Sequence, residues 1–250
     1  MKFILTVLSF ALIAFPVLSG DLMVTFDDAT IGQGPGDGDW VVYDEDDLGD
    51  PGPSSWEVLD SPIDGPAMSQ SSNIWGDATD TVAIGSFVVY DLEEWTDFIL
   101  EVDVVANDND GMGLVWRWED INNHYRYITM IDPGNSPNGR RGPYRLLERR
   151  LGDDGGDELP FYETLDESDE SYVQGQPQNW RLEATGNSFS FYVDDKLTLE
   201  ATDNAYETGK VGFLVYAQSG IFFDNLVITD TWAVDANRKL ASSWGHMKNY

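Results

Sequence analysis

Short runs of alternating apolar and polar residues are the feature that most limits how this chain can fold. The runs are rich in β-branched and aromatic residues, and clusters of Gly, Asn, Asp and Pro separate them. Side chains alternate with a period of two on a strand, whereas a helix repeats about every 3.6 residues. Because no segment shows a capped amphipathic helix, we expect strands over 22–26, 40–43, 55–59, 67–74, 81–92, 98–105, 111–118, 125–131, 144–149, 179–185, 188–193, 197–201, 210–217 and 221–229.

Many short strands joined by turn signals predict an all-β sandwich or barrel. Gly186 and Asn187, and then Asp194 and Asp195, stand where tight hairpin turns are needed. The segment 152–171 carries nine acids and no base, and we expect it to be a loop.

The composition excludes several classes of protein. A formal net charge of −31 repels phosphate backbones, so we expect no nucleic-acid partner. The absence of Cys removes thiol nucleophiles, disulfides and Cys-based metal sites. Two His residues far apart in sequence make a His-rich metal centre improbable. A hydrophobic content of 42% exceeds that of a disordered acidic chain, and so predicts a packed core.

The two ends of the chain differ from the body. Residues 1–19 read as a signal peptide with a basic start, a short apolar core and small residues before the cut. An uncleaved anchor is the alternative, although a membrane span needs about 20 apolar residues. We therefore predict a secreted or cell-surface protein with no membrane span, a domain over 20–230 and a basic tail over 231–250. The tail is either a sorting or anchoring segment or a short amphipathic appendix that covers an edge of the domain.

Four stretches, in order, resemble the concanavalin A-like jelly-roll superfamily. They lie at 26–40, 107–130, 179–203 and 209–229, and the most specific are NDNDGMGLVWRWEDINNHYRYITM and the last stretch, GKVGFLVYAQSGIFFDNLVIT. The nearest relatives are laminin-G-like domains and the lectin-like C-terminal domain of thrombospondins. The resemblance implies a two-sheet antiparallel jelly-roll sandwich whose first and last strands are adjacent.

One strand of the second stretch carries the ligand-binding hypotheses. Its period of two places Met112, Leu114, Trp116 and Trp118 on one face, either as a platform for stacking sugars or as sandwich core. Polar side chains that could bind a ligand on a concave face are Arg117, His124 and Arg126.

Asp-rich positions suggest calcium as a cofactor. The turn at 107–111 packs hard oxygen donors against a Gly, but Ca²⁺ takes six to eight oxygens, so other groups must help. The resemblance implies calcium at this turn and a structural calcium between the terminal strands. The candidate ligands are Asp108 and Asp110 at the first position, and Asp27 and Asp224 at the second; ordinary solvated turns are the alternative for both.

A basic segment precedes the acidic one. Five of the 14 basic residues of the chain lie between 140 and 150, namely Arg140, Arg141, Arg145, Arg149 and Arg150. They either form a site for an anionic group or offset the acidic segment beside them.

Enzyme hypotheses find little support in the sequence, and no catalytic residue is assigned. Glucanases of this fold carry Glu-x-Asp-x-Glu or Glu-x-Asp-x-x-Glu on one strand. Glu101 and Asp103 begin that pattern, but Val105 and Ala106 stand where the acid/base is required. A polysaccharide lyase needs a Tyr or His base beside an Arg, for which Tyr125, His124 and Arg126 are chemically suited.

Three functions remain open at this point. The first is a secreted, non-catalytic module that binds calcium and recognises a glycan or an extracellular or cell-surface partner. The second is a secreted polysaccharide hydrolase or lyase on the same fold. The third is a surface-layer or adhesion component. The acidity has a separate explanation as well, because acidic surfaces keep proteins soluble at high salt.

Overall fold

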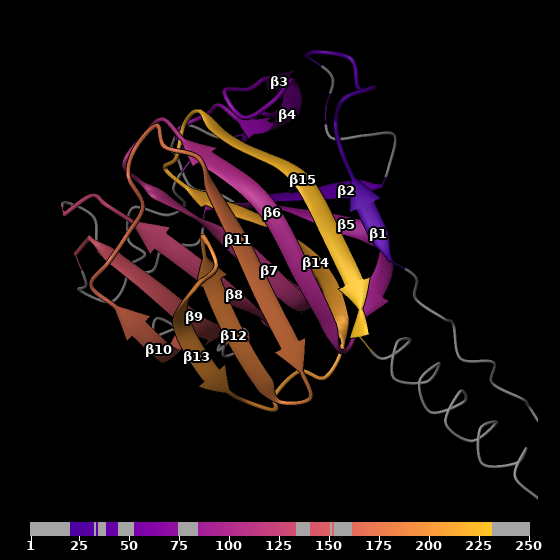
Figure 1. The fold of residues 1–250 in the computed structure, drawn as a ribbon, viewed down its shortest axis with the longest axis vertical. Helices are drawn as coiled ribbons and strands as arrows, with labels where there is room; N and C mark the ends of the chain where they lie inside the picture. Colours follow the sequence, from indigo (N-terminus) through magenta and orange to yellow (C-terminus); the bar gives the residue numbers. More distant parts are fainter. Residues whose placement is uncertain are drawn as a thin grey trace, which may run out of the picture.

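Two antiparallel sheets packed face to face make up the part of the chain that the structure describes (Figure 1). The computed structural model describes residues 21–32, 34, 39–44, 53–74, 85–133, 141–150, 152 and 162–231. The predicted signal peptide and residues 232–250 of the predicted tail lie outside these ranges. Among the described residues, no helix is both long enough and apolar enough to cross a membrane.

The first sheet, sheet A, has eight strands. The first and last strands of the domain lie side by side in it, since Leu22 pairs with Ile228 and Val24 with Leu226 (Figure 1). That adjacency agrees with what the resemblance implies. Along the sheet the order is β13 (Lys196–Thr202), β12 (Ser188–Val193), β11 (Gln178–Thr185), β6 (Phe98–Ala106), β15 (Ile221–Asp230), β4 (Pro66–Gln70) and β3 (Trp56–Asp60), with β1 (Leu22–Val24) also paired to β15.

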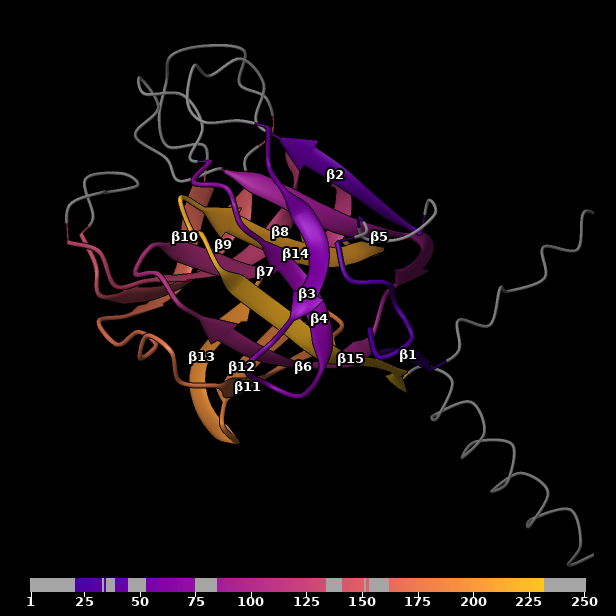
Figure 2. The ribbon, with the colours of Figure 1, turned by 90° about the horizontal axis from the view of Figure 1, so that it is seen from above.

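The second sheet, sheet B, has seven strands and lies behind sheet A in the view of Figure 1; Figure 2 shows the sandwich from above. Its order is β10 (Tyr162–Ser168), β9 (Tyr144–Arg150), β8 (Asn123–Met130), β7 (Gly111–Asp120), β14 (Gly209–Tyr216), β5 (Ser86–Trp95) and β2 (Trp40–Asp44). The predicted all-β jelly-roll sandwich is therefore confirmed.

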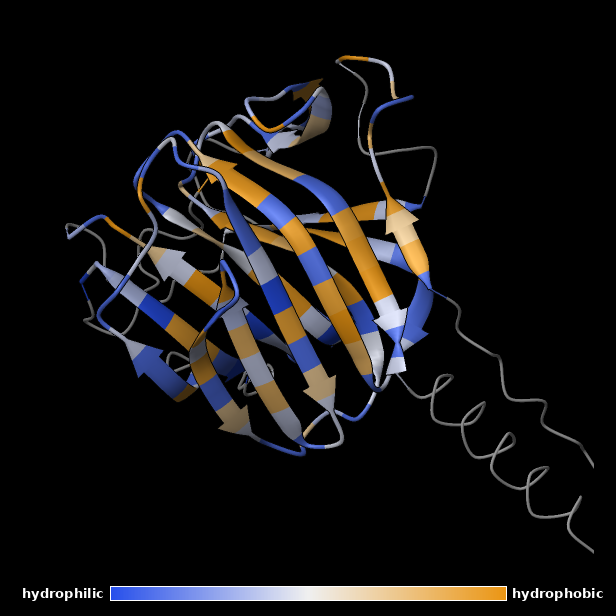
Figure 3. Cartoon of the chain, in the orientation of Figure 1, coloured by the Kyte–Doolittle hydropathy of each residue, from blue (hydrophilic) through white to orange (hydrophobic). Residues whose placement is uncertain are grey.

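The core lies between the inner faces of the two sheets. Apolar and polar residues alternate along most strands, as the banded colouring of Figure 3 shows. Aromatic rings join the sheets: Phe213 of sheet B stacks on Phe223 of sheet A at 4.2 Å, and Tyr127 stacks on Phe191 at 3.7 Å. Burial of these large apolar surfaces is the main contribution that holds the sheets together.

A β-bulge in β7 breaks the alternation at Arg117. Arg117 has a φ of 47°, and the pairing register of β7 shifts there against both β8 and β14. Trp116 stays in the inner core, but Trp118 packs in a second apolar cluster with Phe87 on the other face of sheet B. The prediction that Trp118 shares a face with Met112, Leu114 and Trp116 is wrong, because one extra residue reverses the side-chain direction.

The acidic segment also differs from its prediction as a loop. Residues 162–168 form β10, the edge strand of sheet B, which pairs with β9. Acidic side chains at Glu163, Asp166 and Glu167 hide the apolar alternation in the sequence. Charges and a bulge on an edge strand oppose pairing with another chain. The same charges give the strand the composition of a loop.

Gly209 makes room for the bulge. A Cβ at this position would lie 2.5 Å from the carbonyl carbon of Arg117 and 2.7 Å from the amide nitrogen of Trp118. Its φ of +154° also belongs to the region that side chains rarely adopt.

We expect Gly209→Ala to lower the free energy of unfolding by about 1–3 kcal/mol, because the bulge must shift to relieve an overpacked contact. Urea unfolding followed by Trp fluorescence measures the effect. Gly34→Ala is the matched control, since its Cβ would meet nothing closer than 3.9 Å. Equal stability of the two variants would contradict this account of the bulge.

Candidate functional site

Polar and aromatic side chains from four neighbouring strands gather on the outer face of sheet B. They alternate with Leu114, Tyr127 and Leu147, which point into the core from the same strands. Every member is at most 5% exposed. The members, called here the outer-face set, are Trp118 of β7, His124 and Arg126 of β8, Glu148 and Arg150 of β9, and Tyr162 of β10.

His124 lies at the centre of this set. Its ring stacks on Trp118 with the centroids 4.5 Å apart. Nδ1 lies 3.1 Å from the carbonyl oxygen of Asp120, and Nε2 lies 3.0 Å from the hydroxyl of Tyr162. Burial, reinforced by the charges of Arg126 and Arg150, holds the pKa of His124 well below its usual value. The imidazole is therefore neutral: Nδ1–H donates to the carbonyl and Nε2 accepts from the Tyr162 hydroxyl.

Arg126 and Glu148 form a buried ion pair beside His124. Nε and Nη2 of Arg126 lie 2.8 and 2.7 Å from Oε2 of Glu148, and both side chains are almost completely buried. Thr164 donates to the other carboxylate oxygen at 3.2 Å. The Arg126 guanidinium also lies 3.4 Å from the centroid of the Tyr162 ring. Charge-assisted bonds and a cation–π contact thus fix this pair in one geometry.

Arg150 is the last member of the set. It follows Glu148 by two residues on β9, so its side chain points to the same outer face. Its Nη2 donates to Oδ1 of Asn122 at 3.1 Å, and its guanidinium lies 5.1 Å from the Tyr162 ring centroid. The set therefore combines two guanidinium groups, one carboxylate, a neutral imidazole and two large aromatic rings. These groups can donate to and accept from sugar hydroxyls, and the rings can face the C–H side of a pyranose.

The structure separates Arg117 from His124 and Arg126, with which the sequence grouped it. Its guanidinium donates to the carbonyl oxygens of Tyr206 at 2.8 Å, Thr96 at 3.0 Å and Gly186 at 2.6 Å. It also lies over the ring of Phe189, a residue of the inner core. Arg117 thus ties three loops together at one end of the sandwich, and it does so because the bulge turns it inward.

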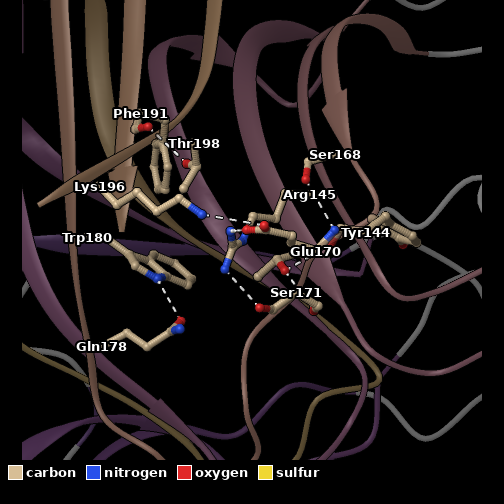
Figure 4. Close-up of polar contacts among 11 residues, drawn as sticks. Tyr144, Arg145, Ser168, Glu170, Ser171, Gln178, Trp180, Phe191, Lys196 and Thr198 are labelled. Atoms are coloured by element: carbon tan, nitrogen blue, oxygen red, sulfur yellow. Dashed lines mark hydrogen bonds and ion pairs between the residues drawn. The ribbon is translucent and has the colours of Figure 1, made fainter. Parts of the chain in front are cut away.

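The arginines of the basic segment point to two sides of β9. Arg145 points toward the open edge of the sandwich, where it donates to Glu170 at 2.9 Å and to the carbonyl oxygen of Ser171 at 2.8 Å (Figure 4). Lys196 reaches the same Glu170 from β13 at 3.4 Å. This contact joins sheet B to sheet A through a residue of the acidic segment.

Arg149 makes a second contact of the same kind. It binds Asp203 at 2.9 Å and forms a close ion pair with Glu163. Arg145 and Arg149 therefore form ion pairs with acidic residues within and beside the acidic segment. Such pairing was one of the two interpretations that the sequence left open. Arg150 points the other way, into the outer-face set, and Arg140 lies outside the described residues.

The turn at 107–110 concentrates negative charge. Burial, together with the neighbouring charges of Asp108 and Asp132, raises the pKa of Asp110 to about 7. The carbonyl oxygens of Asp108 and Asp110 are engaged, since the Tyr172 hydroxyl lies 3.0 and 2.7 Å from them. Ser219 donates to the carboxylate of Asp108 at 3.0 Å. A cation would relieve the repulsion at Asp110.

Asp27 and Asp224 are brought close together, as the sequence proposed for the terminal strands. Burial and then the charges of Asp27 and Asp103 raise the pKa of Asp224. Asp224 is buried and lies directly opposite Asp103 on β6. Among the described residues, however, no group of three or more His, Cys, Asp or Glu side chains is arranged to hold a metal ion.

The residues that begin a glucanase pattern lie on the outer face of sheet A. Asp103 accepts from the side-chain amides of Asn179 at 2.9 Å and Asn225 at 3.0 Å, and Glu101 is exposed. Both point away from the inner core and from the outer-face set on sheet B. A cleft formed by a row of carboxylates is not found on this strand, because Val105 follows them on the same face.

Sequence reasoning missed Trp118, Glu148, Arg150 and Tyr162 as neighbours of His124 and Arg126. Glu148 lies on the strand predicted over 144–149, and Arg150 directly follows that strand. Extending the period of two by one residue would have placed both side chains on one face. Tyr162 carries no such signal, because it lies within the acidic segment.

Comparison with known proteins identifies the architecture. No family model matches this sequence, and no curated protein matches it. Among solved structures, the chain is similar to the carbohydrate-binding module CBM66 from Bacillus subtilis, with a TM-score of 0.52 and 18% identity over 77% of this chain and 96% of that one. A Bacillus subtilis protein of unknown function with a galectin-like fold gives a TM-score of 0.50 and 12% identity over 77% and 89%. At these identities the similarity shows a shared jelly-roll fold.

Buried His124 and half-buried Asp110 make opposite contributions to stability between pH 5 and 7. The depressed pKa of His124 means that the unfolded chain binds the proton more tightly, so stability is lost as the pH falls below about 6.5. The raised pKa of Asp110 means that the folded chain binds the proton more tightly, so stability is gained as the pH falls through 7.

Substitution separates the two effects. In Asp110→Asn, we expect the free energy of unfolding to fall with pH below 6.5, by up to about 1.4 kcal/mol per pH unit. Adding His124→Gln should remove that slope. Urea unfolding at pH 5, 6, 7 and 8 measures it. An unchanged slope in the double variant would show that His124 does not titrate as the buried geometry requires.

Proposed function

We propose that this chain is an exported carbohydrate-binding module. The outer-face set carries the proposal, because it places hydrogen-bonding charges beside large aromatic rings on one face of a jelly-roll sheet. The structural similarity to CBM66, whose name describes a carbohydrate-binding module, supports it through the fold. Since the set is buried, we expect a glycan to reach it through local opening of that face.

Arg150 offers the sharpest test, because it lies at the margin of the set and is its most exposed member. Affinity electrophoresis of the full chain in gels that contain neutral or uronate polysaccharides gives the first measurement. We expect Arg150→Gln to weaken retention about tenfold or more, as the loss of a hydrogen bond from a charged group costs about 1.5–3 kcal/mol.

Arg181→Gln is the matched control, since Arg181 stacks on Tyr192 in sheet A, away from the outer-face set. Near-ultraviolet circular dichroism confirms that each variant is folded. Retention of Arg150→Gln equal to that of the unsubstituted chain would remove the outer-face set from the binding site.

A lyase acting on a uronate polymer is the second candidate, and one specific contact favours it. The Tyr162 hydroxyl lies 3.0 Å from His124 Nε2, and the Arg150 guanidinium lies 5.1 Å from the centroid of the same Tyr ring. A Tyr–His pair can move the proton of a β-elimination while a guanidinium neutralises a uronate carboxylate. A hydrolase has less support, because the one carboxylate of the outer-face set, Glu148, is paired with Arg126 and a glycosidase needs two.

Activity separates the two candidates. A lyase releases unsaturated uronate products that absorb in the ultraviolet, and Tyr162→Phe should abolish that release while leaving retention in the gel nearly unchanged. A chain that is retained by polysaccharide but releases no such product is a binding module.

Calcium binding is a further part of the proposal, and it rests on the charge of the turn around Asp110. Calcium should raise the melting temperature and EDTA should lower it, at fixed high ionic strength. A ligand at a hundredfold excess over its Kd stabilises by about 2.7 kcal/mol. Asp110→Asn should raise the melting temperature in EDTA at pH 8 and reduce the response to calcium. An identical calcium response in both proteins would show that Asp110 is not a ligand.

A further inference from the structure

The outer face of sheet B continues past Trp118 toward β2, the strand at the other edge of the sheet (Figure 2). Tyr43 of β2 packs against Trp118 with the ring centroids 5.3 Å apart. Phe87 of β5 is the register partner of Tyr43 and lies 4.9 Å from the same Trp118 ring. On its other side, Trp118 stacks on His124 at 4.5 Å. The aromatic part of the outer-face set therefore extends across the sheet to β2.

An ion pair lies beside this row of rings. Lys210 of β14 is the register partner of Trp118, and the next residue, Val211, belongs to the inner core. Alternation along the strand therefore directs Lys210 to the outer face. There it forms a close ion pair with Asp91 of β5. The hydrogen bond to Asp91 raises the pKa of Lys210, so the ammonium group stays charged.

These side chains reach solvent, unlike the outer-face set. Lys210 is 25% exposed, Asp91 is 36% exposed and Tyr43 is half-buried, whereas Trp118 is almost completely buried. A ligand in solution can therefore contact them without the local opening that the outer-face set requires. Tyr43, Asp91 and Lys210 are called here the margin group.

The margin group offers a sugar three kinds of contact. The Asp91 carboxylate accepts hydrogen bonds from hydroxyl groups, and the Lys210 ammonium group donates hydrogen bonds to them. The exposed part of Tyr43 adds apolar ring surface and a phenolic hydroxyl. Aromatic surface with a few convergent polar groups is typical of small-molecule sites.

The charge around the margin group favours a neutral sugar. Asp91 and, to a smaller extent, Glu94 raise the pKa of Lys210, so both acids lie near the ammonium group. The amide of Asp91 donates to the carbonyl oxygen of Asp39, which brings a further acid to this edge. An anionic sugar would meet these acids beside a cation that is already paired, whereas neutral hydroxyls can bond to both members of the pair.

We propose that the margin group is the exposed entry subsite of the outer-face set, and that the ligand is a neutral polysaccharide that contacts both along one chain. One sugar residue binds Tyr43, Asp91 and Lys210 at the surface, and the chain continues past Trp118 into the set. The inference rests on the proposed carbohydrate-binding function and adds to it a ligand class, an entry point and a need for more than one sugar residue.

Amide chemical shifts of the full chain test the entry subsite directly, because they report the margin group and the outer-face set separately. The probes are cellohexaose, xylohexaose and mannohexaose, the matching disaccharides, and trigalacturonate as the anionic comparison. We expect at least one hexasaccharide to shift the amides of both groups in a saturable way. Its disaccharide should bind about tenfold more weakly, because it cannot engage both places at once. Trigalacturonate should leave the amides of the margin group in place.

Asp91→Asn is the most informative variant, because its two expected effects have opposite signs. It removes the charge that accepts sugar hydroxyls, so the hexasaccharide should bind about fivefold more weakly. It also releases Lys210, so trigalacturonate should begin to shift the Lys210 amide. A loss of fold cannot produce both changes. Glu183→Gln is the matched control, since Glu183 pairs with Arg181 at similar exposure on sheet A, and it should leave both titrations unchanged.

Each outcome bears on the proposals separately. Neutral probes that shift the outer-face set but not the margin group overturn the entry subsite and leave the proposed function standing. Equal affinity for a hexasaccharide and its disaccharide does the same, and so does binding of trigalacturonate at Lys210 in the unsubstituted chain. If none of the neutral or uronate probes or polymers binds, both proposals fail.

Discussion

Close packing of two amphipathic sheets against each other is the constraint on which this structure depends. Each inner face is a row of alternate residues, and stacked rings such as Phe213 on Phe223 bridge the faces. A shift of one residue in any strand would turn its apolar side chains outward. The register is therefore strongly determined wherever both faces are crowded.

The bulge at Arg117 changes the direction of two neighbouring side chains. It turns the guanidinium toward three carbonyl groups at the end of the sandwich, where each hydrogen bond offsets the cost of burying a charge. It also sends Trp118 to the outer face, where the indole stacks on His124. The outer-face set thus depends on a backbone distortion that Gly209 accommodates.

Burial of two arginines, a glutamate and a histidine outside the main core is costly unless the groups satisfy one another. Here Arg126 pairs with Glu148, and His124 lies between a carbonyl group and the Tyr162 hydroxyl. The resulting network is specific in geometry. At the open edge of the sandwich, ion pairs such as Lys196 with Glu170 are exposed to water and contribute little stability.

The sequence by itself determined most of the strands, the two-sheet class and the shared face of His124 and Arg126, because a period of two is a local property of the backbone. The resemblance, which places the terminal strands side by side, also predicted that Asp27 lies near Asp224. The tertiary structure decided what no local pattern encodes: which face Trp118 occupies, that the acidic segment contains edge strand β10, and that Glu148 and Tyr162 meet His124. These depend on a bulge and on pairing between strands far apart in the chain, and both are settled only when the sheets pack.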